Sequence, residues 1–121
     1  MAEVNRAAAP GQNIVLQDAQ TTGNGKAIAI PSSIRHHTFY IKGNGVIGAG
    51  AVTLETADNT EYTGTWAALP SYTDPTNNAN PVTVTSSAEK IYTFIGALAA
   101  VRARISTTVT TTTVTVIYRG H

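Results

Sequence analysis

The sequence predicts an all-β protein: a two-sheet antiparallel β-sandwich, jelly-roll-like, with about eight strands. Short runs in which apolar and polar residues alternate are typical of half-buried strands. Clusters of Gly, Pro, Asn and Asp, which favour turns, separate these runs. The most helix-like stretch, residues 86–103, is interrupted by Gly96 and carries β-branched and aromatic residues, so a strand, a turn and a strand fit it better. The strand spacing favours a jelly roll, with an immunoglobulin-like order as the alternative.

The chain is expected to begin with an extended arm and to continue as one domain. Residues 1–12 are small and polar and run into the break signal Pro10-Gly11. They are expected to form either a flexible tail or an arm that becomes ordered on a neighbouring subunit. Residues 13–121 have the length of a single β-sandwich domain. The N-terminus starts with methionine and lacks the apolar core of a signal peptide, so we expect a complete small protein.

Strands and turns follow one another along the whole domain. Strands are expected at residues 13–19, 27–30, 35–43, 51–57, 65–70, 82–85, 90–96, 101–106 and 113–118. Two Gly-Asn-Gly sequences, residues 23–25 and 43–45, are expected to be turns because Gly and Asn tolerate a positive φ. The final 21 residues contain an uncharged stretch, Ile105 to Ile117, and are expected to form a hairpin with a threonine-rich outer face.

Alternation divides the strand residues between two faces. One face carries His37, Phe39, Ile41, Val52, Leu54, Val101, Ala103, Ile105, Val114, Val116 and Tyr118. The opposite face carries His36, Thr38, Tyr40, Thr53, Glu55, Arg102, Arg104, Ser106, Thr113, Thr115 and Ile117. The run at residues 90–96 differs from the others, because apolar side chains occur on both of its faces.

The composition argues against several classes of function. The chain has no cysteine, which excludes disulfides, thiolate metal ligands and cysteine nucleophiles. Only 12% of the residues are charged and the net charge is +1, whereas a nucleic-acid-binding protein needs clustered Lys and Arg. No apolar run approaches the roughly 18 residues of a membrane span. A surface with so little charge suits a protein that functions as part of a larger assembly.

Residues that could carry catalysis or bind a metal are sparse. His36 and His37 are adjacent on a strand and point to opposite faces, so we do not expect them to share a metal ion. Asp58 and Glu61 lie in one turn but lack the dense oxygen ligands of a calcium loop. The sequence contains neither a nucleophile elbow nor a phosphate-binding loop. We therefore expect no enzymatic activity, no metal site and no cofactor.

Two groups of side chains could either bind a partner or serve the fold. Arg102 and Arg104 lie two residues apart on one strand face, and Arg119 is expected nearby on the hairpin partner. These arginines either keep an uncharged face soluble or bind carboxylates of a partner, to which guanidinium groups bind in a bidentate manner. Trp66 either completes the edge of the core or, with Leu69 and Pro70, offers a platform for a sugar.

Three segments together resemble a known group of proteins. They are "VLQDAQTTGNGKAIAIPSS", "GAVTLETADNTEYTGTWAALP" and "YTFIGALAAVRARISTTVTTTTVTVIYRG". Their pattern is similar to that of the jelly-roll head decoration, or cementing, proteins of tailed bacteriophages, and the resemblance covers about residues 13–120. It implies a multi-copy structural protein on the outside of a capsid. It carries no site residues over to this chain and does not separate a capsid protein from a tail or fibre module.

The residues and the resemblance together predict a non-enzymatic virion structural protein. We expect it to be made in the bacterial host cytoplasm, to bind the outer surface of a phage capsid and to cement neighbouring capsid subunits. Its partners would be the major capsid protein and copies of itself, dimers being favoured over trimers, without nucleic acid or membrane. The residues expected at the contacts are Val4, Arg6, Tyr72, Asp74, Arg102, Arg104 and Arg119. The alternative is a tail or fibre carbohydrate- or receptor-binding module that stacks Trp66 or Tyr72 on a sugar.

Overall fold

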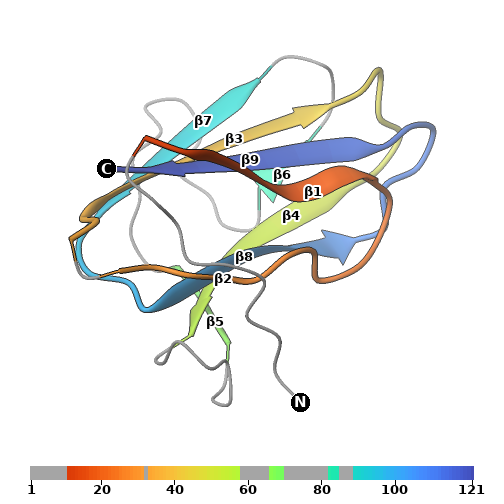
Figure 1. Ribbon diagram of the computed structural model, residues 1–121. Coiled ribbons are helices and arrows are strands. Elements are labelled where there is room, and N and C mark those ends of the chain that lie inside the picture. Colours follow the sequence, from red (N-terminus) through yellow and green to blue (C-terminus); the bar gives the residue numbers. More distant parts are fainter. Residues whose placement is uncertain (1–10, 32, 58–65, 70–81, 85–88) are drawn as a thin grey trace.

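The computed structural model describes residues 11–31, 33–57, 66–69, 82–84 and 89–121 (Figure 1). In this part of the chain all regular structure is β, as predicted. The strands are β1 (Asn13–Gln20), β2 (Ile28–Ala29), β3 (His36–Gly43), β4 (Ala51–Ala57), β5 (Ala67–Ala68), β6 (Val82–Thr83), β7 (Lys90–Ile95), β8 (Ala100–Thr107) and β9 (Val114–Gly120). Each lies within a run expected from the sequence or within two residues of one.

The strands form two antiparallel sheets that pack face to face as a sandwich (Figure 1). One sheet has the order β1-β9-β3-β7, and the other has the order β2-β8-β4-β5, with β6 also pairing with β4. Rolling up one long antiparallel hairpin produces this set of strand pairs: β1 with β9, β2 with β8, β3 with β7 and β4 with β5. This order is that of a jelly roll, so the predicted architecture is confirmed in preference to the immunoglobulin-like alternative.

The runs expected at residues 65–70 and 82–85 each contain a two-residue strand, β5 and β6. The two-residue strand β6 pairs with Ala51 and Val52 of β4, whereas β5 pairs with Glu55 and Thr56. The two short strands therefore share one edge of β4, at opposite ends of it.

The prediction that the final 21 residues form a hairpin is wrong. β8 lies between β2 and β4, whereas β9 lies between β1 and β3 in the other sheet. The chain crosses between the sheets after Thr107, and Val109 is buried in the crossing, where its N–H donates to the carbonyl of Thr21 at 2.8 Å. Alternation could not reveal the crossing, because a strand of either sheet turns every second side chain toward the same core.

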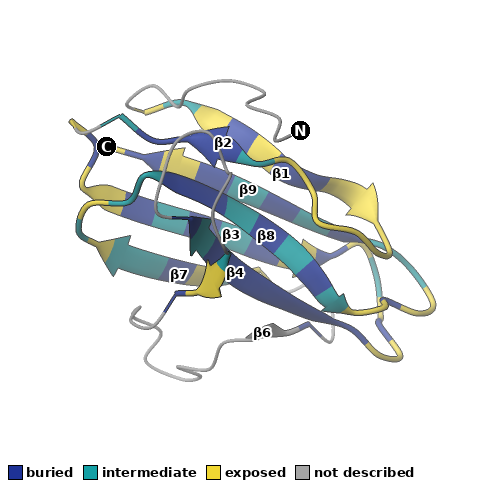
Figure 2. Cartoon of the chain, turned by 90° about the horizontal axis from the view of Figure 1, so that it is seen from below, coloured by how far each residue is buried: buried dark blue, intermediate teal, exposed yellow. Residues whose placement is uncertain are grey.

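Alternation predicted the core-facing side chains correctly, and Figure 2 shows buried and more accessible positions alternating along the strands. The buried positions include His37, Phe39, Ile41, Val52, Leu54, Val101, Ala103, Ile105, Val114, Val116 and Tyr118. Strand β4 departs from the pattern, because Thr53 and Glu55, on its outer face, are also buried. The outer face of this sheet is therefore covered at β4.

A polar clamp joins the first strand to the second sheet. The buried amide of Gln17 donates to the carbonyls of Ala103 at 2.7 Å and Gly23 at 3.1 Å. The predicted turn at Gly23–Gly25 makes this approach possible, because both glycines have a positive φ. A Cβ at Gly25 would collide with the Leu16 carbonyl and the Gln17 amide.

Candidate functional site

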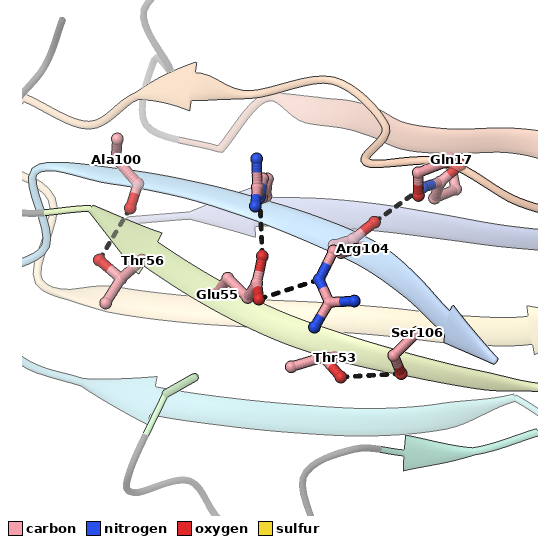
Figure 3. Close-up of polar contacts among 10 residues, drawn as sticks. Gln17, Thr53, Glu55, Thr56, Ala100, Arg104 and Ser106 are labelled. Atoms are coloured by element: carbon pink, nitrogen blue, oxygen red, sulfur yellow. Dashed lines mark hydrogen bonds and ion pairs between the residues drawn. The ribbon is translucent and has the colours of Figure 1, made fainter. Parts of the chain in front are cut away.

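The outer face of the β2-β8-β4-β5 sheet carries a cluster of one carboxylate and two guanidinium groups, Glu55, Arg102 and Arg104. The Nε of Arg102 donates to Oε1 of Glu55 at 2.7 Å. The Nε of Arg104 donates to Oε2 at 3.1 Å, as Figure 3 shows. The register of β4 against β8 sets this geometry, since Glu55 pairs with Arg102 and Thr53 pairs with Arg104. Each arginine donates to a different oxygen, so both oxygens of the Glu55 carboxylate accept a charged hydrogen bond.

The carboxylate of this cluster is buried, whereas one of its cationic partners is partly exposed. Glu55 is only 6% exposed, whereas the Arg104 side chain is 38% exposed. A carboxylate with so little access to water needs its cationic partners, because an unpaired buried charge is costly. One carboxylate balances one of the two cations, and the remaining positive charge is nearest to solvent at Arg104.

Trp66 lies at the edge of the core, as the first of its two interpretations predicted. It packs against the small cluster of Ala57 and Ala100 and is half-buried. The guanidinium carbon of Arg102 lies 4.3 Å from the centroid of a Trp66 ring, a cation–π contact. The stack holds Arg102 between an aromatic face and the carboxylate of Glu55, so this guanidinium group is fixed by partners within the chain.

The structure separates the predicted site residues into three groups. Arg102 and Arg104 lie together, as expected. Arg119 does not join them, because it lies on β9 in the other sheet and pairs with Asn13 and Thr38. The other expected contact residues, Val4, Arg6, Tyr72 and Asp74, lie outside the described residues, as do Asp58 and Glu61.

Glu55 is the residue of this cluster that sequence reasoning missed. Its outward position on β4 follows from alternation, but its partners depend on which strand lies beside β4 and in which register. The available signal was one carboxylate on β4 and two arginines on β8, all facing outward on strands that carry no other charged residue. Opposite charges on one sheet face could have been tried as cross-strand neighbours.

A second polar group, His37 with Tyr118, is completely buried between the sheets. The Nε2 of His37 lies 2.8 Å from the carbonyl oxygen of Gly96, which can only accept, so Nε2 carries the hydrogen. The Nδ1 atom therefore accepts from the Tyr118 hydroxyl at 2.7 Å. Desolvation by burial is the main reason that the pKa of His37 lies below 6.5, and burial likewise raises the pKa of Tyr118.

The side chains of His36 and His37 point to opposite faces of β3, as the sequence predicted. It is exposed and stacks on His121, with ring centroids 5.3 Å apart and an interplanar angle of 10°. Among the described residues, no group of three or more His, Asp or Glu side chains is placed to hold a metal ion. In the same part of the chain, no helix is long and apolar enough to cross a membrane.

Comparison with known proteins gives one informative likeness. The sequence matches no family model and no curated protein. The structure is similar to the crystal structure of SPBc2 prophage-derived protein YomS, with a TM-score of 0.67 and 21% sequence identity. The alignment covers 88% of this chain and 88% of that one. At this identity the likeness establishes a shared fold.

At the two polar clusters, most of the described side chains are held by partners within the chain. His37 is the histidine whose hydrogen bonds would orient it, but it is sealed in the core, with both ring nitrogens occupied. Arg102 is fixed by Glu55 and Trp66. Arg104 retains an accessible side chain, so at this cluster it is the group that a partner could reach.

Proposed function

We propose that this chain is a non-enzymatic virion structural protein that binds the outside of a phage capsid and cements neighbouring capsid subunits. The observation that carries the proposal is the jelly-roll fold shared with a prophage-derived protein over most of both chains. The segments that resemble head decoration proteins point the same way. The expected partners are the major capsid protein and further copies of this chain.

The physical properties of the domain suit this role. A protein that binds assembled shells better than free subunits shifts the assembly equilibrium toward the shell by mass action. Each contact can be modest, because it repeats over a symmetric surface. The sandwich is held by a continuous apolar core and by polar links within the chain, such as the amide of Gln17 and the carboxylate of Glu55. Such a domain can remain folded on a particle outside the cell.

The test is the position and number of copies in purified particles of the phage that encodes this chain. Quantitative gel analysis gives the copy number, and cryo-electron microscopy gives the position. Hundreds of copies distributed over the head, and heads that release DNA at a lower temperature when the gene is deleted, are expected. A few copies confined to the tail would reject cementing in favour of the tail-module alternative. Absence from particles would reject both.

A further inference from the structure

An apolar row crosses the outer face of the other sheet, β1-β9-β3-β7, from one edge to the other. The row consists of Val15, Ile117, Tyr40 and Ile91, each paired in register with the next. The strand neighbours of Val15, Ile117 and Tyr40 are buried in the core. Tyr92 beside Ile91 is also buried, so the row faces away from the core. Figure 1 shows the four strands side by side in this order.

The row is accessible at both of its ends. Val15 and Ile91 are exposed, Ile91 at 49%, and Tyr40 and Ile117 in the middle are half-buried. Ile95, four residues after Ile91 on β7, is 67% exposed and pairs with His36 on the same face. Three of the four large apolar side chains that are exposed in the described part of the chain therefore gather on this one face.

A cation flanks the apolar row on each side. Arg119, paired with Thr38, belongs to the next row in one direction, and Lys42, paired with Thr115, belongs to the next row in the other. Both are exposed. Rows on one face of a strand are about 6.8 Å apart and neighbouring strands about 4.8 Å apart, which sets the two cations about 14 Å from each other.

These charges disfavour a second copy of the chain on this face. A two-fold axis along the row would bring Arg119 of one copy within about one strand spacing, ~5 Å, of Lys42 of the other. An axis across the middle of the row would bring each cation equally near its own symmetry mate. Like charges placed so closely in an interface are costly, so the face is better matched to a different surface.

We propose that this face is where the protein docks on its capsid partner, a protein surface with exposed apolar side chains between carboxylates about 14 Å apart. The inference rests on the proposed function and names the contact within it. Apolar side chains in the row would be buried in the contact, and Arg119 and Lys42 would pair with carboxylates at its rim.

The arginine cluster on the opposite face is less suited to this docking. Arg102 and Arg104 already share the carboxylate of Glu55, so a partner would have to compete with a contact within the chain. Arg119 and Lys42 have no described carboxylate within ion-pair distance. The expected contact residue Arg119 is therefore retained in the docking face, whereas Arg102 and Arg104 are assigned to the stability of the β4–β8 pair.

The size of the face explains why many copies would act together. Four strands are about 19 Å wide and four rows about 27 Å long, which gives roughly 500 Å². A standard stable interface buries about 800 Å² on each partner. A single contact on this face would therefore be weak, and repetition over the shell would supply the occupancy.

Substitutions on the face test the proposal against purified heads of the encoding phage prepared from a strain that lacks this gene. The full chain is added to the heads, and the bound amount is measured after sedimentation. Ile91→Glu places a charged carboxylate among the apolar side chains of the contact, and Lys42→Glu reverses one rim cation. Each is expected to lower affinity for the heads at least tenfold. Matched controls off the face, Val46→Glu and Lys26→Glu, are expected to bind within twofold of the wild type.

Each outcome separates the docking face from the proposed function. If the wild type binds heads and the face variants bind equally well, the docking face is wrong while cementing stands. If the wild type does not bind heads, cementing itself fails and the docking proposal fails with it. If the free wild type is dimeric and Ile91→Glu makes it monomeric by light scattering, a second copy occupies the face and the partner assignment is overturned. Circular dichroism and thermal melting confirm that every variant is folded.

Discussion

Replacing Glu55 with glutamine should destabilise the protein far more than an ordinary surface substitution. Glu55 is 6% exposed and accepts from Arg102 at 2.7 Å and from Arg104 at 3.1 Å. The change Glu55→Gln keeps the shape of the side chain but removes the charge that balances the two guanidinium groups. It also turns an amide NH2 toward donors, so one of the two hydrogen bonds is lost.

The expected size follows from the burial of the three groups. Removing one partner of a fully buried ion pair costs about 3–5 kcal/mol. Arg104 is 38% exposed and its charge is partly screened by water, so we expect about 2–3 kcal/mol. Unfolding entropy of about 2.1 cal/mol/K per residue makes 1 kcal/mol worth about 4 °C in a chain of 121 residues. The melting temperature should therefore fall by about 8–12 °C.

Thermal melting followed by circular dichroism at pH 7 measures this change. Glu89→Gln removes an exposed carboxylate beside β7 and is the matched control, with an expected effect within about 0.5 kcal/mol. Arg102→Met combined with Glu55→Gln should cost less than the sum of the two single changes, because both remove the same interaction. A melting temperature lowered by less than about 4 °C in Glu55→Gln would show that water, rather than the protein, solvates this carboxylate.

Three further predictions concern the core and the turn beside it. Because burial lowers the pKa of His37, the stability that its neutral form contributes should be complete above pH 6.5 and should decrease as the pH falls from 6.5 toward the lowered pKa. In melting experiments at several pH values, His37→Gln should flatten this dependence of stability on pH. An unchanged dependence would assign it to other groups. Tyr118→Phe removes the hydroxyl that donates to His37 and should lower the free energy of unfolding, measured by denaturant titration, by about 1–3 kcal/mol. A loss below about 0.5 kcal/mol would count against this hydrogen bond. Gly25→Ala should lower the free energy of unfolding by at least about 2 kcal/mol, because the added Cβ would collide with backbone at a residue whose φ is positive. Gly23→Ala should lower it less, because Gly23 also has a positive φ but has open space around it. Equal losses in the two variants would mean that the collision at Gly25 is relieved.

Local pattern in the sequence determined the strands and the direction of their side chains. The period of two in residues 36–43 predicted that His37, Phe39 and Ile41 face one side, and all three are buried. The glycines of the Gly23–Gly25 turn were recognisable because the left-handed backbone that they adopt is restricted to few residue types. These features depend on neighbours within a few positions along the chain, which is why the sequence alone was enough.

Only the tertiary structure decided which strands lie side by side, and with them the candidate surfaces. Alternation shows that Arg102 and Arg119 each point out of a sheet, but not that they belong to different sheets. The partners of Glu55 lie on a strand about fifty residues later, and the row from Val15 to Ile117 joins the two ends of the domain. The physical reason is that the period of a strand fixes the direction of its side chains, whereas pairing and register depend on how the whole chain closes around one core.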